Sequence, residues 1–472
     1  MRSERRCDDV TKAQLKTNAQ SFLNKYFSGE GMDYRKVISI MIPILVDQAF
    51  IVFLNLLNTA MISSSGVAAV SAVNMVDSLN IFLVNVFVAV STGGTVVVAQ
   101  YKGSGNDPMV SKAAAGSVAS VFLLAFCISM LVVVFHTSTL NVLFGRAEED
   151  VFYNARIYLI GSGISYCGIA ATEAVCGALR GVGETRSSLM LSLIMNLSYM
   201  LLNGLFINIL HMGVLGMVTA LNISRYLSAV CAIIYLVKIN TSLHFRFADV
   251  FHFNPSMLKR IMFIGLPFAA EQMFFNGGKI LTQTFIVSLG TYAMATNAIC
   301  GSMSLLFQIP ANACALSVIT VVGQCMGRRN VKDARKFIKS FLVLSSFSFV
   351  AMAVMIFPLF QPIVSLFHPP QEIVHNIFLI LVINEVAQVT LWSVSFITPS
   401  GLRAAGDSKF TSVVSMLSMW LFRVVLGYIL GIVLPFGIVG VWLAMDCEWS
   451  VRGLVFLIRF KGKKWYQHHL ID

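Results

Sequence analysis

Pro43-Ile44-Leu45-Val46-Asp47-Gln48, in the first long apolar run, recurs 224 residues later as Pro267-Phe268-Ala269-Ala270-Glu271-Gln272. The same offset, without a gap, aligns further residues along the chain: Ser64, Gly66, Ala69, Ser78, Gln100, Gly103 and Asn106 fall on Ser288, Gly290, Ala293, Ser302, Gln324, Gly327 and Asn330. We infer that the chain is a tandem duplication of one half. Each half therefore begins with a proline and an acid inside a stretch that is otherwise apolar.

The composition is that of an integral membrane protein. Of 472 residues, 57% are hydrophobic and 12% are charged, against roughly 25% charged in a typical soluble domain. The mean hydropathy is +0.78, and runs of about 20 apolar residues, each long enough to cross a bilayer as a helix, recur along the chain. The polar residues 1–36 lack the apolar stretch of a signal peptide. We predict an all-α protein of the cell (inner or plasma) membrane.

Twelve spans fit the apolar runs, six in each half. They are expected at about 37–61, 72–99, 110–136, 151–178, 187–210 and 214–238, and then at about 259–289, 294–323, 336–358, 372–400, 411–434 and 438–460. The expected organisation is a cytoplasmic amino-terminal segment 1–36, a six-helix lobe 37–238, a cytoplasmic linker 239–258, a second six-helix lobe 259–460 and a cytoplasmic tail 461–472. Because each half has an even number of spans, the halves are parallel repeats, which is an architecture of transporters.

The formal net charge of +12 is compatible with a nucleic-acid partner or with the basic loops of a membrane protein. Nearly all Lys and Arg residues outside the spans lie in segments that twelve spans place on the side of both termini. The loops on the other side contain only Arg146 and Arg156, close to three acids. We therefore predict that both termini are cytoplasmic, that the lipid bilayer is a partner and that nucleic acid is not.

Motifs of enzymes and metal sites are absent from the sequence. The nine cysteines form no CxxC pair and no cluster with histidine at metal-ligand spacing, so we expect neither a metal nor a bound cofactor. There is no HExxH, no GxxxxGK, and no Ser/His or paired-Asp arrangement typical of an enzyme. We expect a transporter of small molecules that is a monomer.

Four stretches together carry a resemblance to a known family. They are Ser64-Ser65-Gly66-Val67-Ala68-Ala69-Val70-Ser71, Ser91-Thr92-Gly93-Gly94-Thr95-Val96-Val97-Val98-Ala99-Gln100-Tyr101-Lys102-Gly103, Val322-Gly323-Gln324-Cys325-Met326-Gly327 and Pro399-Ser400-Gly401-Leu402-Arg403-Ala404-Ala405-Gly406-Asp407. From about residue 35 to 460 the chain resembles the multidrug and toxic compound extrusion (MATE) family of cation-coupled antiporters. The resemblance implies two six-helix lobes around a central V-shaped cavity. It also implies export of small amphipathic organic compounds by alternating access, driven by H+ or Na+.

One position departs from the family's pattern. In much of the family the first helix ends in a Val-Asp-Thr-like triplet whose acid is assigned to cation coupling, whereas the matching triplet here is Leu57-Asn58-Thr59. Asn58 cannot titrate, although its amide oxygen could still help to hold Na+. Asp47 matches an acid found in a subset of the family, and we expect it to take over this task.

Asp47 and Glu271 are the first candidates for cation coupling. An ionised carboxylate near the bilayer centre costs on the order of 2.5–3.5 kcal/mol on insertion scales, so such a residue usually faces a polar cavity or a partner. The proline four residues before each acid frees a backbone carbonyl nearby, which suits a cation or a proton-carrying water. The alternative is that both acids only satisfy neighbouring backbone or arginine groups. Asp77, an acid of the first half only, is a further candidate.

Lys279 lies eight residues after Glu271, about 12 Å along an ideal helix, and therefore needs another partner. It could neutralise Asp77, Asp47 or Glu385 across the cavity, bind an anionic group of the substrate, or extend towards water. A lysine that binds substrate would argue against a purely cationic range of substrates.

The substrate cavity is expected to be lined by Gln48, Gln272 and Lys279, and by Glu385 together with Trp392. Trp392 follows Glu385 by seven residues and so shares nearly the same helical face. The alternative for this last pair is a polar contact between helices, with the tryptophan against lipid.

Paired motif residues in the expected cytoplasmic loops are interpreted as structural: Gln100, Gly103, Arg180 and Gly183 in the first half, and Gln324, Gly327, Arg403 and Gly406 in the second. The four glycines are expected in turns, and the two arginines at helix ends or on acidic lipid. Asp446, Glu448 and Arg452 lie within two helical turns of one another, which favours a structural ion-pair cluster.

Two other functions are compatible with these patterns. A flippase for a lipid-linked precursor would keep the fold, and a basic cavity with several arginines would favour it, whereas the sequence offers chiefly Lys279. An intramembrane enzyme is the remote alternative.

Overall fold

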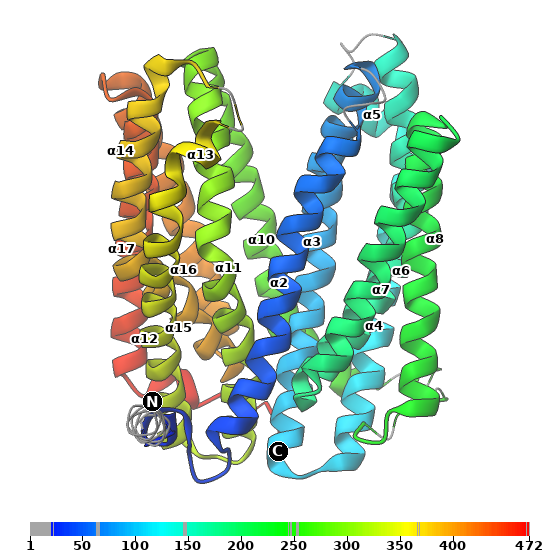
Figure 1. The fold of residues 1–472 in the computed structure, drawn as a ribbon. Helices are drawn as coiled ribbons and strands as arrows, with labels where there is room; N and C mark the ends of the chain where they lie inside the picture. The colour runs from blue at the N-terminus through cyan, green and yellow to red at the C-terminus, as the bar shows by residue number, and fades with distance from the viewer. Residues whose placement is uncertain are drawn as a thin grey trace, which may run out of the picture.

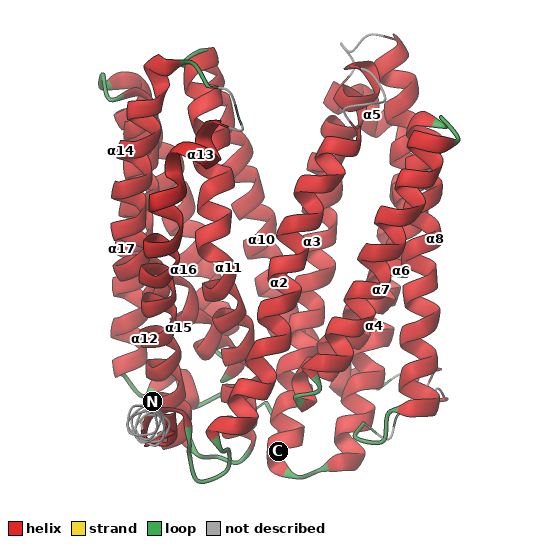
Figure 2. Cartoon of the chain, viewed as in Figure 1, coloured by secondary structure: helices red, strands yellow, loops and turns green. Residues whose placement is uncertain are grey.

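The computed structural model describes residues 20–471, apart from 22, 63–66, 145–148, 244, 246–247, 252–253, 366, 368 and 469. For residues 55–62, 67–68, 142–144, 248 and 251 it describes the backbone only. Within this part of the chain there are helices and short connections, and no strand (Figure 2). The prediction of an all-α protein is confirmed.

Two bundles of long helices lie side by side, and the described ends of the chain lie at the same end of the bundles (Figure 1). The first bundle contains α2 (Tyr34–Ile62), α3 (Val67–Ser104), α4 (Asp107–Val134), α5 (His136–Phe144), α6 (Glu149–Val182), α7 (Thr185–Asn203) continued by the π-helix Gly204–Ile209, and α8 (Gly213–Ile234) continued by the π-helix Tyr235–Ile239. The short helix α9 (Ala248–Phe251) follows in the connection to the second bundle.

The second bundle repeats this arrangement with more interruptions. It contains α10 (Pro255–Ser288), α11 (Thr291–Gly327), α12 (Val331–Ile356) with the 3-10 turn Phe357–Leu359, α13 (Phe360–Ser365), α14 (Gln371–Ala387) continued by the π-helix Gln388–Trp392 and α15 (Ser393–Ala404), α16 (Ser408–Ser418) continued by the π-helices Met419–Leu426 and Ile429–Val433, and α17 (Gly437–Lys461). A 3-10 turn, Lys464–Tyr466, follows α17.

Ten helical segments in the described part of the chain are long and apolar enough to cross a membrane. α10 and α17, with 34 and 25 residues, have the length as well but carry several charged residues. Charges that find partners inside the protein are compatible with a membrane span, so these two helices complete six spans in each bundle. The prediction of twelve spans in two repeats is confirmed, and the exact limits of the lobes stay a prediction.

Capping residues that the duplication preserved mark where equivalent helices begin. The side chain of Asn106 accepts a hydrogen bond from the backbone N–H of Met109 at the start of α4. The side chain of Asn330, its repeat equivalent, accepts one from the N–H of Asp333 at the start of α12. Such a cap satisfies a backbone donor that the first helical turn leaves unpaired. The two halves therefore share local folding signals as well as a hydrophobic pattern.

The two lobes meet through the first long helices of each, since α3 packs against α10 and α11, and α2 packs against α11. Gly93 and Gly265 permit this approach. A Cβ on Gly93 would lie 2.6 Å from the carbonyl oxygen of Ile261, and one on Gly265 would lie 2.9 Å from the Cα of Val90. Glycines at such positions let helix backbones come close within a membrane. The lobes are therefore in backbone contact along α3 and α10.

Two glutamines of the paired motifs connect the lobes, and they lie close to the carboxyl-terminal ends of α3 and α11. The side-chain amide of Gln100 donates a hydrogen bond to the carbonyl of Ala404, at 2.8 Å. The amide of Gln324 donates the equivalent bond to the carbonyl of Gly181, at 3.0 Å. Each glutamine thus reaches from its own lobe to the loop of the other lobe.

Gly103 and Gly327 belong to the same contact and are not turn residues, contrary to the prediction. Gly103 lies against the carbonyl of Gln324, and Gly327 against that of Gln100, with no room for a Cβ at either position. Both glycines lie in the last turn of a helix, α3 or α11, so their missing side chains serve the packing between the lobes. We call Gln100, Gly103, Gln324 and Gly327 the interlobe latch.

The other two motif glycines lie in turns. Gly183 and Gly406 have φ angles of +91° and +104°. Glycine adopts this left-handed region readily, whereas other residues are strained there.

Candidate functional site

A cavity of about 410 Å³ lies between the two lobes. Its walls come from α2 and α3 of the first lobe and from α10, α11, α15, α16 and α17 of the second. The lining residues are Gln48, Asn85, Val88, Thr92, Phe268, Glu271, Gln272, Phe275, Asn312, Ala315, Leu316, Ile319, Ser395, Phe396, Pro399, Ser400, Arg403, Ser415 and Arg452. Sites for small ligands usually have volumes of about 300–1,000 Å³ and mostly apolar walls with a few polar groups. The cavity therefore has the size and composition of a small-molecule site.

The duplicated stretch reaches this cavity from both lobes. Gln48 and Gln272, the last residues of its two copies, both line the wall. Glu271 lines it too, whereas Asp47, the equivalent acid, does not. The two copies are therefore placed differently with respect to the cavity.

Glu271 forms an ion pair with Arg403 in the cavity wall. Nη2 of Arg403 lies 2.7 Å from Oε2 of Glu271, and both residues are buried. The guanidinium also lies over the ring of Phe268, 3.8 Å from its centroid. Arg403 was expected to clamp a helix end or to meet lipid. Instead, its long side chain reaches α10 and neutralises a carboxylate that would be costly to bury alone.

Arg452 of α17 is the second arginine of the wall, and it belongs to a buried ion-pair cluster. Its Nε donates to Oγ of Ser395 at 2.7 Å, and its Nη1 lies 3.0 Å from Oε1 of Glu448. The other oxygen of Glu448 lies 2.7 Å from Nη2 of Arg423. The ion-pair cluster predicted on this helix is thus present, with Arg423 as an additional member. Asp446 lies outside it and accepts a hydrogen bond from an asparagine of α14.

Asp47 lies inside the first lobe. The residue is 8% exposed, and its Oδ1 is buried with no hydrogen-bond partner among the described residues. The polar groups around it are Ser192 of α7 and the ion pair between Arg180 and Glu173, which are 3.4 Å apart. A buried carboxylate oxygen without a partner costs free energy, and a proton or a cation could satisfy it.

Asp77 belongs to a polar network between α3 and α6, away from the cavity wall. It accepts hydrogen bonds from the hydroxyl of Tyr158 at 2.7 Å and from the amide of Asn80 at 3.2 Å. The hydroxyl of Tyr166 in turn donates to Asn80 at 2.6 Å. The side chain of Asn58, another coupling candidate, lies outside the described residues.

Glu385 and Trp392 do not line the cavity, contrary to the prediction. Glu385 is buried in the second lobe, and neither of its oxygens has a hydrogen-bond partner in the described chain. Trp392 is buried as well and stacks on Phe396, with ring centroids 4.5 Å apart. The prediction assumed one α-helical face through both residues, whereas Gln388–Trp392 is a π-helix, whose wider turn rotates the residues that follow. The wall is formed further along, by residues such as Phe396 and Pro399.

Lys279 forms no ion pair within the part of the chain that the structure describes, so pairing with Asp47, Asp77 or Glu385 is not observed. Its side chain is exposed, and the ammonium lies over the ring of Phe275, 4.9 Å from the centroid. Phe275 lines the cavity. Lys279 therefore lies next to the cavity wall but does not line the cavity.

Several lining residues that the sequence interpretation missed could have been found from the repeat. Val88 and Asn312 are equivalent at the offset of 224, as are Thr92 and Leu316, and all four line the cavity. No such signal existed for Arg452, because its spacing from neighbouring acids marked it as structural only.

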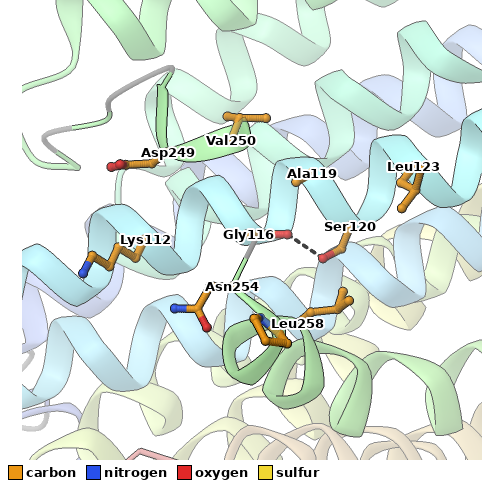
Figure 3. A pocket seen from close by; sticks show the side chains of 10 residues that line it. Lys112, Gly116, Ala119, Ser120, Leu123, Asp249, Val250, Asn254 and Leu258 are labelled. Atoms are coloured by element: carbon orange, nitrogen blue, oxygen red, sulfur yellow. Dashed lines mark hydrogen bonds between the residues drawn. The ribbon is translucent and has the colours of Figure 1, made fainter. Parts of the chain in front are cut away.

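A second hollow of about 470 Å³ lies between α4, α9 and the start of α10 (Figure 3). Lys112 and Asp249 are the charged residues that line it, and Ser120 donates a hydrogen bond to the carbonyl of Gly116 at 2.5 Å. None of the predicted site residues lies there. Across the described residues, no group of three or more His, Cys, Asp and Glu side chains could hold a metal ion.

A family model described as MatE matches the chain twice, at residues 43–205 and at residues 267–429. The two matches start and end 224 residues apart, which is the offset of the duplicated stretch. Together they cover more than half of the chain.

Individual relatives also cover most of the chain. The uncharacterized transporter YisQ of Bacillus subtilis is 24% identical over 431 residues, which are 90% of this chain and 93% of that protein. The probable multidrug resistance protein NorM of Thermotoga maritima is 24% identical over 439 residues, 91% of this chain and 93% of that protein. A solved structure described as the outward-facing conformation of a multidrug resistance MATE family transporter of the MOP superfamily has a TM-score of 0.84 and 18% identity, and covers 90% of this chain and 94% of that one.

Proposed function

The chain belongs to the MATE family of multidrug efflux transporters, and we propose that it is a secondary active exporter of small amphipathic organic compounds, which it exchanges for H+ or Na+ by alternating access. The family matches cover both halves of the chain, and ten helical segments of its described part are long and apolar enough to cross a membrane. Export rather than catalysis is the activity of this family.

The cavity between two equivalent lobes is the observation that carries the proposal. It is lined from both lobes, and the lobes are held together near one end by the interlobe latch. In transporters built from repeats, rocking of one lobe against the other changes the side to which a shared cavity opens. The latch is therefore a contact that must break when the cavity opens towards that end.

We assign ion coupling first to Asp47 and Glu271. A proton or cation on Asp47 would satisfy its unpaired buried oxygen. A proton on Glu271 would weaken its ion pair with Arg403, and so would change the charge of the cavity wall. Asp77 and the amide oxygen of Asn58 are the next candidates.

We also propose that both termini are cytoplasmic. The described ends of the chain lie at the same end of the bundles. Arg328 and Arg329 lie in the turn between α11 and α12, which contacts the amino-terminal segment through the hydrogen bond from Asn330 to Glu30. An excess of Lys and Arg marks the cytoplasmic side of membrane proteins.

Ion release on substrate binding tests the proposed exchange. Purified protein in a weakly buffered detergent solution is mixed with amphipathic compounds of positive, neutral and negative charge, while a pH indicator and a Na+ electrode follow the solution. Binding of a substrate is expected to release H+ or Na+. Binding of compounds without release of either ion would contradict coupled exchange.

A flippase for a lipid-linked precursor is the second candidate function. It is favoured by one observation, that Arg403 and Arg452 both line the cavity, whereas the sequence offered chiefly Lys279. Proteoliposomes that contain a fluorescent lipid-linked diphosphate separate the two candidates. Movement of the lipid to the other leaflet without movement of water-soluble compounds would favour the flippase.

A further inference from the structure

The wall that the second lobe contributes to the cavity is rich in basic residues. Arg403 and Arg452 line it directly. Arg423 and Lys279 lie over the ring of the lining residue Phe275, 5.2 and 4.9 Å from its centroid. The facing wall of the first lobe has no charged lining residue, because it consists of Gln48, Asn85, Val88 and Thr92.

The acid that lines this wall does not balance the two arginines that line it. Glu271 is paired with Arg403, and Glu448 is shared by two of the arginines. The third acid nearby, Asp446, accepts a hydrogen bond from Asn384. Among the residues that line the cavity there are two bases, Arg403 and Arg452, and one acid, Glu271, so the formal charge of the lining is positive.

Two arginine nitrogens of the wall have no hydrogen-bond partner among the described residues. They are Nε of Arg403 and Nη2 of Arg452, in residues that are 4% and 2% exposed. Buried donors in folded proteins are nearly always paired. A charged oxygen is the strongest acceptor for a guanidinium, and the planar fork matches a carboxylate, sulfonate or phosphate. The two unpaired donors thus indicate an anionic ligand.

We propose that this wall binds the anionic group of an amphipathic organic anion, a carboxylate, sulfonate or phosphate, between Arg403 and Arg452. The apolar body of the ligand packs against Phe268, Phe275 and Phe396, which line the same wall. The proposal rests on the proposed export function and specifies its substrate class. An exporter with this wall binds organic anions more tightly than organic cations of the same size and shape.

Glu271 has a defined part in this site as the competitor of the ligand. Among the described residues, Glu271 is the acid in the cavity lining. Its carboxylate already pairs with one nitrogen of Arg403. Replacing it by glutamine removes the competing charge and raises the net charge of the wall. Binding of an anion is therefore expected to become tighter in Glu271→Gln, whereas a cation site would lose affinity.

Three pyrene probes of equal shape and different charge test the site: pyrene-1-sulfonate, 1-pyrenemethylammonium and neutral 1-pyrenemethanol. Fluorescence anisotropy with the full chain in lipid nanodiscs, corrected with empty nanodiscs, measures the three affinities. The wild type is expected to bind the sulfonate at least about tenfold more tightly than the ammonium, with the alcohol between them. Equal or tighter binding of the ammonium overturns the proposal, and this comparison needs no variant.

Variants test whether the proposed residues determine the affinity for the anionic probe. Arg452→Gln is expected to weaken sulfonate binding about tenfold, and Glu271→Gln to strengthen it severalfold. Arg225→Gln is the matched control, because Arg225 is a membrane-embedded arginine of the first lobe that donates to Ser165 at 2.7 Å and does not line the cavity. It should leave the affinity unchanged. Unaltered sulfonate binding in both Arg452→Gln and Glu271→Gln, with normal elution in size-exclusion chromatography, contradicts the proposal.

Flux of the same probes into proteoliposomes separates the anion site from the export function. Selective binding of the sulfonate without ion-driven flux of any probe would leave the site standing and count against export. Ion-driven flux of the ammonium in preference to the sulfonate would support export and contradict the anion site.

Discussion

At the scale of single residues, equivalent acids of the two lobes have different partners. In the second lobe Arg403 pairs with Glu271. In the first lobe the equivalent Arg180 pairs with Glu173 instead, and one oxygen of Asp47 is left without a partner. An acid whose arginine is engaged elsewhere is more available to a proton or a cation than one held in an ion pair.

The cause of this difference is one further residue. At the offset of 223 that relates Arg180 to Arg403, the counterpart of Glu173 is Phe396. A phenylalanine cannot compete for a guanidinium charge, so Arg403 stays with Glu271. The environments of the two duplicated acids therefore differ because Glu173 is present in the first lobe and a phenylalanine replaces it in the second. We expect Asp47 to contribute more to ion coupling than Glu271.

Substitution of Asp47 and Glu271 tests whether Asp47 contributes more to ion coupling. Asp47→Asn should abolish the release of H+ or Na+ on substrate binding, because the amide can neither titrate nor carry a negative charge. Glu271→Gln should reduce the release less. Asp107→Asn, at an exposed acid 3.0 Å from Lys102, is the control and should behave as the wild type. Release of H+ or Na+ at the wild-type level from both Asp47→Asn and Glu271→Gln would contradict the assignment of ion coupling to these two acids.

The stability of the protein depends on the carboxylate of Glu448, which pairs with both Arg423 and Arg452. Glu448→Gln leaves Arg423 and Arg452 with an uncompensated buried charge, and breaking a buried ion pair in this way costs about 3–5 kcal/mol. The midpoint of thermal unfolding in detergent should fall clearly below that of the wild type. Asp107→Asn again serves as the control, because exposed ion pairs contribute about 0–1 kcal/mol. An unchanged midpoint for Glu448→Gln would contradict the buried triad.

The residues of the site could be predicted from the sequence in part. Gln48, Gln272 and Glu271 line the cavity because the duplicated stretch brings them there from both lobes. Arg403 and Arg452 were missed as lining residues. The direction in which a long basic side chain extends depends on the helices around it, and these are set by tertiary packing rather than by local sequence.

At the scale of helices, the apolar runs predicted the long helices but not the wide turns within them. Apolar runs of sufficient length predict where each span lies. The π-helices Gln388–Trp392, Met419–Leu426 and Ile429–Val433 have no comparable signal, and each changes the faces of the residues after it. The π-helix Gln388–Trp392 thus breaks the single α-helical face that the prediction for Glu385 and Trp392 assumes, and both residues are buried within the lobe.

The interlobe latch provides a prediction about helix contacts. Gly327→Ala should separate the ends of α3 and α11, because its Cβ would overlap with the carbonyl of Gln100. Spin labels at the exposed residues Ser104 and Lys332 report this separation by double electron–electron resonance, and the distance distribution should shift to longer values.

Gly301→Ala is the control for this experiment. It lies in the same helix, and no atom would lie within 4 Å of its added Cβ. It should leave the distances as in the wild type. An unchanged distribution in Gly327→Ala would mean that the latch does not hold the lobes together.

At the scale of the whole molecule, the tandem duplication predicted the architecture well. Six spans per half and parallel lobes follow from the offset of 224 and from the even number of apolar runs, and the family matches at 43–205 and 267–429 repeat that offset. The charge of the cavity could not be predicted in the same way. It arises where α10, α15 and α17 come together, and these helices are far apart in the sequence.

Movement of a substrate against its own concentration gradient tests the central claim of ion-driven export most directly. Proteoliposomes with the wild type receive pyrene-1-sulfonate at equal concentration on both sides, and then a pH gradient or a Na+ gradient. We expect accumulation of the probe under at least one gradient, in the direction opposite to ion flow, and its loss when an ionophore collapses that gradient. Identical distribution of the probe and of the ammonium and neutral pyrenes, with and without each gradient, would contradict it.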